Sequence, residues 1–236
     1  MAPVSKNTRV KSARPYQSRV RAQGALDTRR NILDAAMSLF LEHGYGKVTV
    51  ADIATKASLA LPTVYASTGG KAAILDTLID EAMRDPIVDE TLSAVGKSKS
   101  GDEVLRITAH GTRVDNERYH DIIAVMKCAA AVDEKTADIL RQSDEGYRQA
   151  LAQVARRLRT LEALPTGVTE VRATDFLWFY FGHDAWHVLV ADRGWRWDEA
   201  ESWLTSQAVA ALLRPSPKNG GRSMPTAAFS SGVPNT

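Results

Sequence analysis

The stretch that decides the fold spans residues 49–75 and reads TVADIATKASLALPTVYASTGGKAAIL. Its first part places apolar side chains three or four residues apart, through Ile53 and Ala57, which predicts a short amphipathic helix. Asp52 stands three residues after Thr49, the spacing of a capping box, in which each side chain accepts a hydrogen bond from the backbone N–H of the other residue. We therefore expect this helix to begin directly after Thr49.

The second part of the stretch predicts another short helix over about residues 61–67. Pro62 is compatible with that helix because the N–H groups of a first helical turn have no partner within the helix. Gly69 and Gly70 then end it. Two short helices separated by about three residues, 58–60, predict a helix-turn-helix, in which the second helix enters the major groove of DNA.

Two further amphipathic helices flank this pair. The helix before it ends at His43-Gly44, a typical C-terminal sequence, and its apolar stripe consists of Ile32, Leu33, Ala36, Leu39 and Phe40. The helix after it ends near Asp85-Pro86, because proline disfavours helical geometry at the residue before it, and its stripe consists of Ile74, Leu75, Leu78, Ile79, Ala82 and Met83. We expect residues 26–85 to hold a three-helix domain with its helix-turn-helix, together with the helix that connects it to the rest.

Positive charge is concentrated at the N-terminal end of the chain. Residues 1–71 contain 11 Lys and Arg against 4 Asp and Glu, whereas residues 72–236 contain 19 against 24. This asymmetry indicates a polyanionic partner for the N-terminal part, either nucleic acid or an anionic membrane surface. Residues 1–25 carry six of the basic side chains, no acidic one and few large apolar groups, so we expect a disordered basic arm there.

The remainder of the chain predicts an all-α bundle over residues 86–213. Its helices are expected near residues 102–115, 119–131, 133–162, 168–191 and 197–213. Residues 214–236 are rich in Pro, Gly, Ser and Asn without a hydrophobic period, so we expect a disordered tail.

Cysteine content and hydropathy exclude several classes of protein. Cys128 is the only cysteine, so a single chain forms neither an internal disulfide nor a cysteine-based zinc site. No run of 18 apolar residues occurs, and the first 24 residues lack the apolar core of a secretory signal. We expect a cytoplasmic protein with no membrane partner and no cofactor.

The stretch over residues 49–75 resembles the signature of the TetR-type transcriptional repressor family, and the resemblance extends over about residues 26–85. It is carried by Ile53-Ala54, by Thr63 and Tyr65 with one residue between them, and by Lys71. The chain departs from the usual family pattern at Ser58, Ala60 and Thr68. The resemblance implies an all-α protein with an N-terminal DNA-binding domain, followed by a helical bundle for ligand binding and dimerisation.

The resemblance also implies roles for individual residues. Contacts with DNA phosphates are implied for Lys47, Thr49, Tyr65 and Lys71. Contacts with base edges are implied for Leu61, Pro62, Thr63 and Ala66. Arg19 and Arg21 could enter the adjacent minor groove from the basic arm. Singly, Tyr65 could instead be a core aromatic and Lys71 a solvated lysine, and the arm could be an unstructured extension.

The bundle is expected to form a homodimer and to hold a ligand pocket. Residues 176–181 are apolar on every side of a helix, so all faces of that helix are expected to be buried, by the same chain or by a second copy. The dimer interface is expected to use Trp203, Leu204, Val209, Leu212 and Leu213. The pocket candidates are Met126, Tyr147, Trp178 and Tyr180, although an aromatic residue at such a position is more often part of the core.

These features predict a transcriptional regulator and not an enzyme. We expect a repressor that binds palindromic, double-stranded operator DNA as a dimer and is released by a small, partly apolar effector. The alternative is a helical metal-dependent hydrolase, because His183 and His187 stand four residues apart on one helix face. That pair lacks an evident third ligand and the glutamate of the usual hydrolase motif, so we expect no metal site.

Overall fold

The computed structural model describes residues 14–214, and side chains from residue 21 onward. Every regular element of that part of the chain is helical, which agrees with the predicted all-α class. The α-helices are α1 (Arg14–His43), α2 (Val50–Lys56), α3 (Leu61–Thr68), α4 (Lys71–Ala82), α5 (Ile87–Lys97), α6 (Gly101–Ala130), α7 (Glu134–Thr160), α8 (Glu170–Phe181), α9 (His183–Trp186) and α10 (Trp197–Leu212). A 3-10 turn, η1 (Tyr45–Lys47), follows α1, and a π-helical turn, η2 (His187–Asp192), follows α9.

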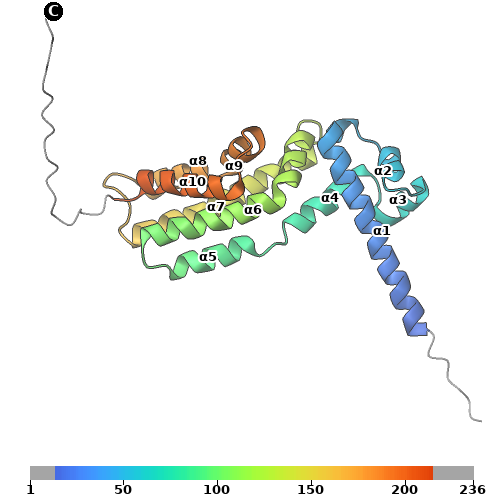
Figure 1. Ribbon diagram of the computed structural model, residues 1–236, viewed down its shortest axis with the longest axis horizontal. Helices are drawn as coiled ribbons and strands as arrows, with labels where there is room; N and C mark the ends of the chain where they lie inside the picture. Colours follow the sequence, from blue (N-terminus) through green and yellow to red (C-terminus); the bar gives the residue numbers. More distant parts are fainter. Residues whose placement is uncertain (1–13, 215–236) are drawn as a thin grey trace, which may run out of the picture.

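The helices form two groups joined by α4 and α6. Figure 1 shows α1, α2 and α3 at one end of the molecule and α5, α7, α8 and α10 at the other. None of the described helices is long and apolar enough to cross a lipid bilayer.

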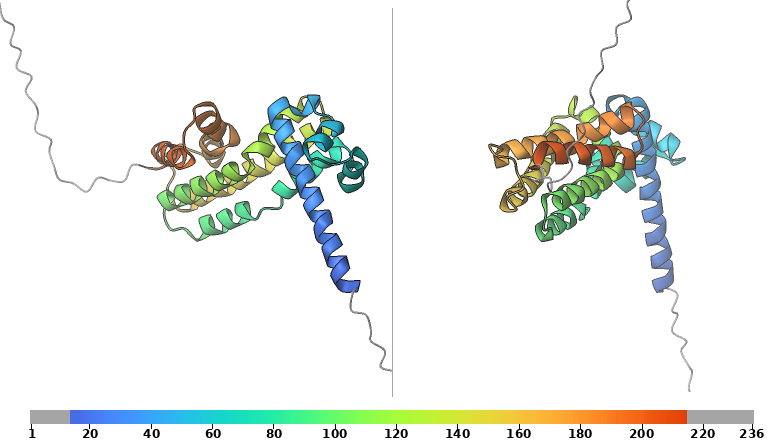
Figure 2. Two further views of the ribbon diagram at one scale, coloured as in Figure 1. Left: turned by 45° about the vertical axis from the view of Figure 1, so that its right-hand side comes forward. Right: turned by 60° about the vertical axis from the view of Figure 1, so that its left-hand side comes forward.

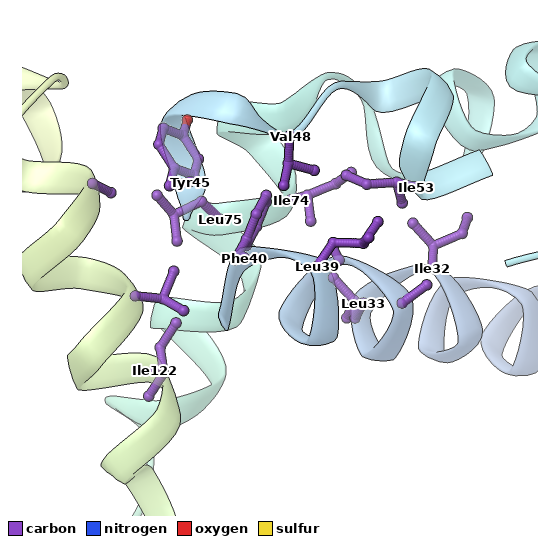
Figure 3. Packing of buried hydrophobic residues seen from close by; sticks show 14 of the residues in the cluster. Ile32, Leu33, Leu39, Phe40, Tyr45, Val48, Ile53, Ile74, Leu75 and Ile122 are labelled. Atoms are coloured by element: carbon purple, nitrogen blue, oxygen red, sulfur yellow. The ribbon is translucent and has the colours of Figure 1, made fainter. Parts of the chain in front are cut away.

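The end of the molecule that holds α1–α4, which the sequence predicts to bind DNA and which we call the DNA-binding end, has its own hydrophobic core. Figure 3 shows ten labelled members of it, namely Ile32, Leu33, Leu39, Phe40, Tyr45, Val48, Ile53, Ile74, Leu75 and Ile122. Burial of each large side chain contributes about 1.5–3 kcal/mol to folding. Ile122 comes from α6, together with Val125, Met126 and Ala129, so the core of the small domain continues into the bundle. A change in the position of α6 would therefore alter the packing of this core.

Helix α1 is longer than the sequence predicted. It begins at Arg14, so residues 14–25 are helical and the expectation of a disordered arm is corrected there. Figures 1 and 2 show this first half of α1 projecting away from the rest of the molecule. Extension of an existing helix fixes one residue for each new hydrogen bond, and Pro15 stands in the first turn, where proline is tolerated. Residues 1–13 of the predicted arm and 215–236 of the predicted tail lie outside the described residues.

The bundle differs from the prediction at three points. One continuous helix, α6, replaces the two expected near 102–115 and 119–131, because no glycine or proline interrupts the chain between them. Helix α5 was not predicted, since Pro86 reads as a stop signal although it precedes the first turn of α5. The helix expected over 168–191 breaks at Gly182, where a Cβ atom would lie 2.5 Å from the carbonyl oxygen of Trp178.

A second core fills the bundle, with α6 packed against α5, α7 and α10. Its largest fully buried side chains include Leu105, Leu158, Leu177, Phe181, Trp186 and Leu212. Helix α7 contributes one face to this core, and its predicted bounds, 133–162, match the observed helix within two residues.

Candidate DNA-binding face, ligand cavity and dimer surface

Helix α2 begins with the capping box that the sequence predicts. The hydroxyl oxygen of Thr49 accepts the backbone N–H of Asp52 at 3.2 Å, and the Asp52 carboxylate accepts the backbone N–H of Thr49 at 2.8 Å. The Thr49 hydroxyl also donates to Asp52 at 2.7 Å, and these bonds hold the pKa of Asp52 below its usual value. The hydroxyl proton of Thr49 is therefore already donated to Asp52, and a hydrogen bond to a DNA phosphate would replace this third bond while both bonds of the capping box remain.

The turn between α2 and α3 is held in a left-handed conformation. Ser58 has φ of 56°, a value that favours glycine because a Cβ atom is crowded there. The side-chain amide of Asn31 donates to the carbonyl oxygen of Ala57 at 2.9 Å and so ties this turn to α1. Sequence reasoning missed Asn31, which lies outside the helix-turn-helix stretch and carries no spacing signal of its own.

The C-terminal end of α3 is held by an arginine of α1. The guanidinium group of Arg29 donates to the carbonyl oxygen of Ser67 and to the hydroxyl of Thr77, both at 3.0 Å. It therefore joins the end of α3 to α1 and α4. Arg29 was also missed, because a lysine or arginine in a basic region reads as a DNA contact or as a solvated charge.

The start of α3 lacks a side-chain cap. Ala60 occupies the N-cap position, and no side chain accepts a hydrogen bond there, so Ser58 does not compensate for the missing hydroxyl. At the other end Thr68 is buried, and its hydroxyl donates to the carbonyl oxygen of Val64 at 3.0 Å. Thr68 therefore fills the core where the family pattern commonly has an aromatic residue.

One face of α3 is open to solvent, and it contains every residue predicted on this helix to contact DNA: Leu61, Pro62, Thr63, Tyr65 and Ala66. Val64 is fully buried and holds the opposite face against the domain. Tyr65 is 53% exposed, so the alternative that it is a core aromatic is wrong. The arrangement presents one continuous surface of a short helix, as a recognition helix requires.

The basic residues around this face lie in different surroundings. Lys47 is exposed on η1. The ammonium group of Lys71 donates to the carbonyl oxygen of Tyr45 at 2.9 Å and lies 4.4 Å from the centre of the Tyr45 ring. Lys71 thus fastens the start of α4 to η1, and the alternative of a freely solvated lysine is wrong.

Arg19 and Arg21 lie on α1 and not on an extended arm. The side chain of Arg21 is exposed, and that of Arg19 lies outside the described side chains. An α-helix is about 10–12 Å wide, whereas the minor groove of B-DNA is about 6 Å wide. A helix does not fit into that groove as an extended arm would, and the contacts of Arg19 and Arg21 with DNA stay a prediction.

A cavity of about 240 Å³ lies between the end of α4, α5, α6, α7 and α9. Two of the four predicted pocket residues, Met126 and Tyr147, line it. A smaller adjoining cavity of about 40 Å³ extends toward α5 and shares Val88, Asp115 and Tyr147 with it. Met126 also belongs to the core of the DNA-binding end, so the cavity wall and that core have a side chain in common.

Trp178 and Tyr180, the other two predicted pocket residues, lie elsewhere. They line a separate groove on the surface between α8, α9 and α10. The ring of Trp178 contacts that of Tyr147 edge-on, with 5.8 Å between ring centres, but it does not line the cavity itself. Their assignment to the ligand pocket is therefore corrected.

The cavity contains two aspartates with opposite pKa shifts. The Asp85 carboxylate accepts hydrogen bonds from the Tyr119 hydroxyl at 2.5 Å, from Arg118 and from the backbone N–H of Ile87, and the bond from Tyr119 contributes most to lowering its pKa. Burial raises the pKa of Asp115 to about 6, and the negative charge of Asp85 adds to the shift.

His183 and His187 do not form the metal-binding pair of the hydrolase alternative. His183 Nδ1 lies 2.8 Å from the side-chain oxygen of Asn116, and burial lowers the pKa of His183 to about 4. His187 instead stacks on His120, with 5.4 Å between ring centres, and faces Asp192. Among the residues that the structure describes, no group of three or more His, Cys, Asp or Glu side chains is placed to hold a metal ion.

The predicted dimer residues divide between core and surface. Leu204 and Leu212 are buried in their own chain, so their assignment to an interface is corrected. They belong to a stripe at every fourth residue of α10 that packs against α6 and α8, completed by Ala200 and Ala208. Trp203 is 44% exposed, and Val209 and Leu213 are partly exposed. Phe179, which was not predicted, is 71% exposed and lines the same groove between α8, α9 and α10 as Trp203.

The fold and this site define a class: an all-helical DNA-binding regulator, with a helix-turn-helix on a small domain and a cavity in an attached bundle. Residues 32–78 match the family described as bacterial regulatory proteins, tetR family. The N-terminal part of the chain is therefore a DNA-binding domain of the TetR family of transcriptional regulators.

Two relatives from Bacillus subtilis strain 168 support this assignment. The chain is 24% identical to the uncharacterized HTH-type transcriptional regulator YvkB, over 70% of this chain and 86% of that protein. It is 33% identical to the uncharacterized HTH-type transcriptional regulator YdeS, over 60% of this chain and 65% of that protein.

Solved structures share the fold at low sequence identity. The structure of a SmeT–triclosan complex is 18% identical and superposes with a TM-score of 0.62, over 89% of this chain and all of that chain. NalD of Pseudomonas aeruginosa, described as the secondary repressor of the MexAB-OprM multidrug efflux pump, is 18% identical with a TM-score of 0.61, over 81% of this chain and 98% of that chain.

Proposed function

We propose that this regulator is a dimeric repressor, which binds palindromic operator DNA through the exposed face of α3 and is released when a small molecule fills the cavity. The observation that carries the proposal is the position of α4. Lys71 begins α4 next to the recognition helix, whereas Ile79, Ala82 and Met83 at its other end line the cavity. One rigid helix of 12 residues therefore touches both sites.

The contacts of α4 give this coupling a physical route. Thr77 receives a hydrogen bond from Arg29, which also holds the end of α3. A ligand that displaces the cavity end of α4 would move these contacts and change the separation of the two recognition helices in the dimer. Release requires only that the ligand binds more tightly to the state that cannot bind DNA.

The dimer is expected to form through α8 and α10. Phe179, Val188 and Trp203 are large, exposed apolar side chains on or beside the groove between α8, α9 and α10. Exposed apolar patches of this kind are typical of interaction surfaces. The descriptions of NalD as a repressor and of SmeT as a triclosan complex support repression and ligand binding by analogy of fold.

Selection of DNA sequences from a random pool by the full chain tests the proposal. We expect enrichment of an inverted repeat whose half-sites lie on successive turns of one DNA face. Thr63→Ala should change the preferred base at one position in each half-site, because Thr63 lies on the exposed face of α3. As a matched control, Thr174→Ala removes a partly buried threonine hydroxyl of α8 and should leave the selected sequence unchanged. Enrichment of no sequence, or of a site without two-fold symmetry, would contradict the proposal.

A further inference from the structure

The lining of the cavity is acidic. Across the larger cavity and the adjoining smaller one, the lining residues include two aspartates, Asp85 and Asp115, and neither lysine nor arginine. His183 is the other lining residue that commonly carries charge, and its low pKa, about 4, keeps it neutral near pH 7. The cavity therefore has a negative electrostatic potential wherever its aspartates are ionised.

Only one of these two carboxylates is satisfied by the protein. Asp85 is neutralised by Arg118 and receives hydrogen bonds from the Tyr119 hydroxyl and the backbone of Ile87. Among the described residues, no hydrogen bond or ion pair reaches the side chain of Asp115. Asp115 is partly buried, and a carboxylate that is mostly removed from bulk water without a partner is unfavourable, so a cation is the group that would relieve it.

Several hydrogen-bond donors around the cavity are already used, although no hydrogen bond among the described residues engages the side chains of Gln142 and Ser143. The Tyr119 hydroxyl donates to Asp85, and the Tyr147 hydroxyl donates to the carbonyl oxygen of Phe181 at 2.8 Å. The side-chain amide of Asn116 donates to the carbonyl oxygen of Thr112, so its oxygen faces His183 Nδ1, which must carry the proton of that hydrogen bond. His183 Nε2 is then left as an acceptor.

The walls of the cavity are apolar and aromatic. Ile122, Met126 and the rings of Tyr119 and Tyr147 contribute to them. Aromatic faces attract cations, and aliphatic side chains accept the apolar part of a ligand. The volume, about 240 Å³, is below the usual range for drug-sized ligands, so a molecule with a single ring fits better than an extended one.

We propose that the cavity binds a small organic cation with an apolar or aromatic part, and that Asp115 is the counter-ion for its ammonium group. The proposal rests on the proposed function in taking this cavity as the effector site, and it adds the chemical class of the effector. Three features of the lining favour a cationic ligand. His183 Nε2 is free to accept a hydrogen bond, the carboxylate of Asp115 has no partner, and the lining contains neither lysine nor arginine. An anionic ligand would meet Asp115 without any cationic side chain of the lining to receive it.

Three ligands with one hydrocarbon frame test the charge preference. We would measure the binding of 4-phenylbutylamine, 4-phenylbutanol and 4-phenylbutyrate to the full chain by titration calorimetry at pH 7.5, in the absence of DNA. The amine is expected to bind at least about tenfold more tightly than the alcohol, the scale of one charge-assisted contact, and the carboxylate is expected to bind more weakly than either.

Two variants assign that preference to Asp115. Asp115→Asn keeps the size of the side chain and removes its charge, so the amine should lose its advantage over the alcohol while the alcohol still binds. Asp121→Asn makes the same change on an exposed part of α6, outside the cavity lining, and should preserve the tenfold preference. The thermal unfolding of both variants should remain cooperative, which shows that the bundle is intact.

The outcomes separate this proposal from the proposed function. Equal or tighter binding of the alcohol or carboxylate, binding of none of the three, or a preference that survives in Asp115→Asn would overturn the cation site. Binding of the amine through Asp115 without any effect on DNA affinity would support the cation site and would contradict release by ligand. Release of DNA by the neutral or anionic probe alone would support ligand control and overturn the choice of a cation.

Discussion

The ammonium group of Lys71 donates a hydrogen bond to the carbonyl oxygen of Tyr45 at 2.9 Å, across the junction between α4 and η1. The same group lies 4.4 Å from the centre of the Tyr45 ring, at a distance typical of a cation–π contact. The lysine predicted to pair with a DNA phosphate thus also fixes the geometry of the DNA-binding domain. An ammonium group has three donors, so both contacts are compatible.

Lys71→Met should therefore affect folding as well as DNA binding. We expect the free energy of unfolding to fall by about 1 kcal/mol, the scale of one hydrogen bond, and DNA affinity to fall for all sequences alike. Lys47→Met is the matched control, because Lys47 is exposed on η1. It should reduce the slope of log affinity against log salt by about one unit and leave stability unchanged. Urea unfolding and salt-dependent DNA titration measure both effects, and an unchanged stability of Lys71→Met would contradict the prediction.

Ser58→Gly should stabilise the protein. Ser58 has φ of 56°, and a left-handed conformation costs a residue with a Cβ atom about 1 kcal/mol or more relative to glycine. We expect an increase of about 0.5–1 kcal/mol in the free energy of unfolding, measured in urea. Glu162→Gly tests the same effect in the bundle, since Glu162 has φ of 53°. Ser67→Gly, within helix α3, should instead lower stability by about 0.5 kcal/mol, and a gain there would show that the backbone conformation is not the cause.

Two glycines that line the cavities should respond to alanine in opposite ways. A Cβ atom on Gly111 would lie 2.1 Å from the hydroxyl oxygen of Thr91, so Gly111→Ala should push α5 from α6 and destabilise the protein by about 1–3 kcal/mol. A Cβ atom on Gly146 would meet nothing within 4 Å, so Gly146→Ala should stabilise α7 by about 1 kcal/mol. Thermal unfolding of the two variants measures the difference, and equal shifts of Tm would refute the packing explanation.

Trp203→Glu should break the dimer without unfolding the chain. Trp203 is exposed in the groove between α8, α9 and α10, and a carboxylate there would be buried against a second copy. Analytical ultracentrifugation should show a shift from dimer to monomer. Val132→Glu places the same charge at another exposed apolar residue and should leave the dimer intact. Leu212→Glu should instead unfold the bundle, because Leu212 is fully buried; a folded dimer of Trp203→Glu would count against the proposed interface.

Asp115→Asn should stabilise the ligand-free protein at neutral pH but not in acid. Because burial raises the pKa of Asp115 to about 6 in the folded chain, the parent loses stability through this group as the pH rises from about 4 to 6. The variant lacks this loss, so its advantage should grow over that range and level off at up to about 3 kcal/mol. The charges that act on the carboxyl group of Asp115, those of Asp85 and Arg118, are present in both proteins, so they do not account for the difference.

The low pKa of His183 has the opposite effect on stability, which falls as the pH drops from about 6.5 toward 4. His183 is present in parent and variant alike, so its contribution cancels in the comparison, as does that of the buried Tyr147 hydroxyl. Urea unfolding at several pH values gives the difference. A constant difference between pH 4 and pH 8 would show that Asp115 does not titrate in this range.

The sequence alone determined where the short helices of the DNA-binding end begin and end, because the signals that set these boundaries are local. The Thr49–Asp52 capping box, the two glycines after α3 and the apolar spacing within α2 each act over a few residues, and the structure has them where they were predicted. The exposed face of α3 followed for the same reason, since helical periodicity turns Tyr65 away from the face that buries Val64.

Tertiary structure alone decided how the bundle uses its residues. Periodicity placed Leu204 and Leu212 on an apolar face of α10, but only packing against α6 and α8 showed that their own chain buries that face. Packing between helices also placed Trp178 in the groove between α8, α9 and α10, with its ring against Tyr147, and not in the lining of the cavity. The unpartnered carboxylate of Asp115 depends on side chains from α4, α5, α7 and α9, and no pattern within one helix reveals what lies opposite it.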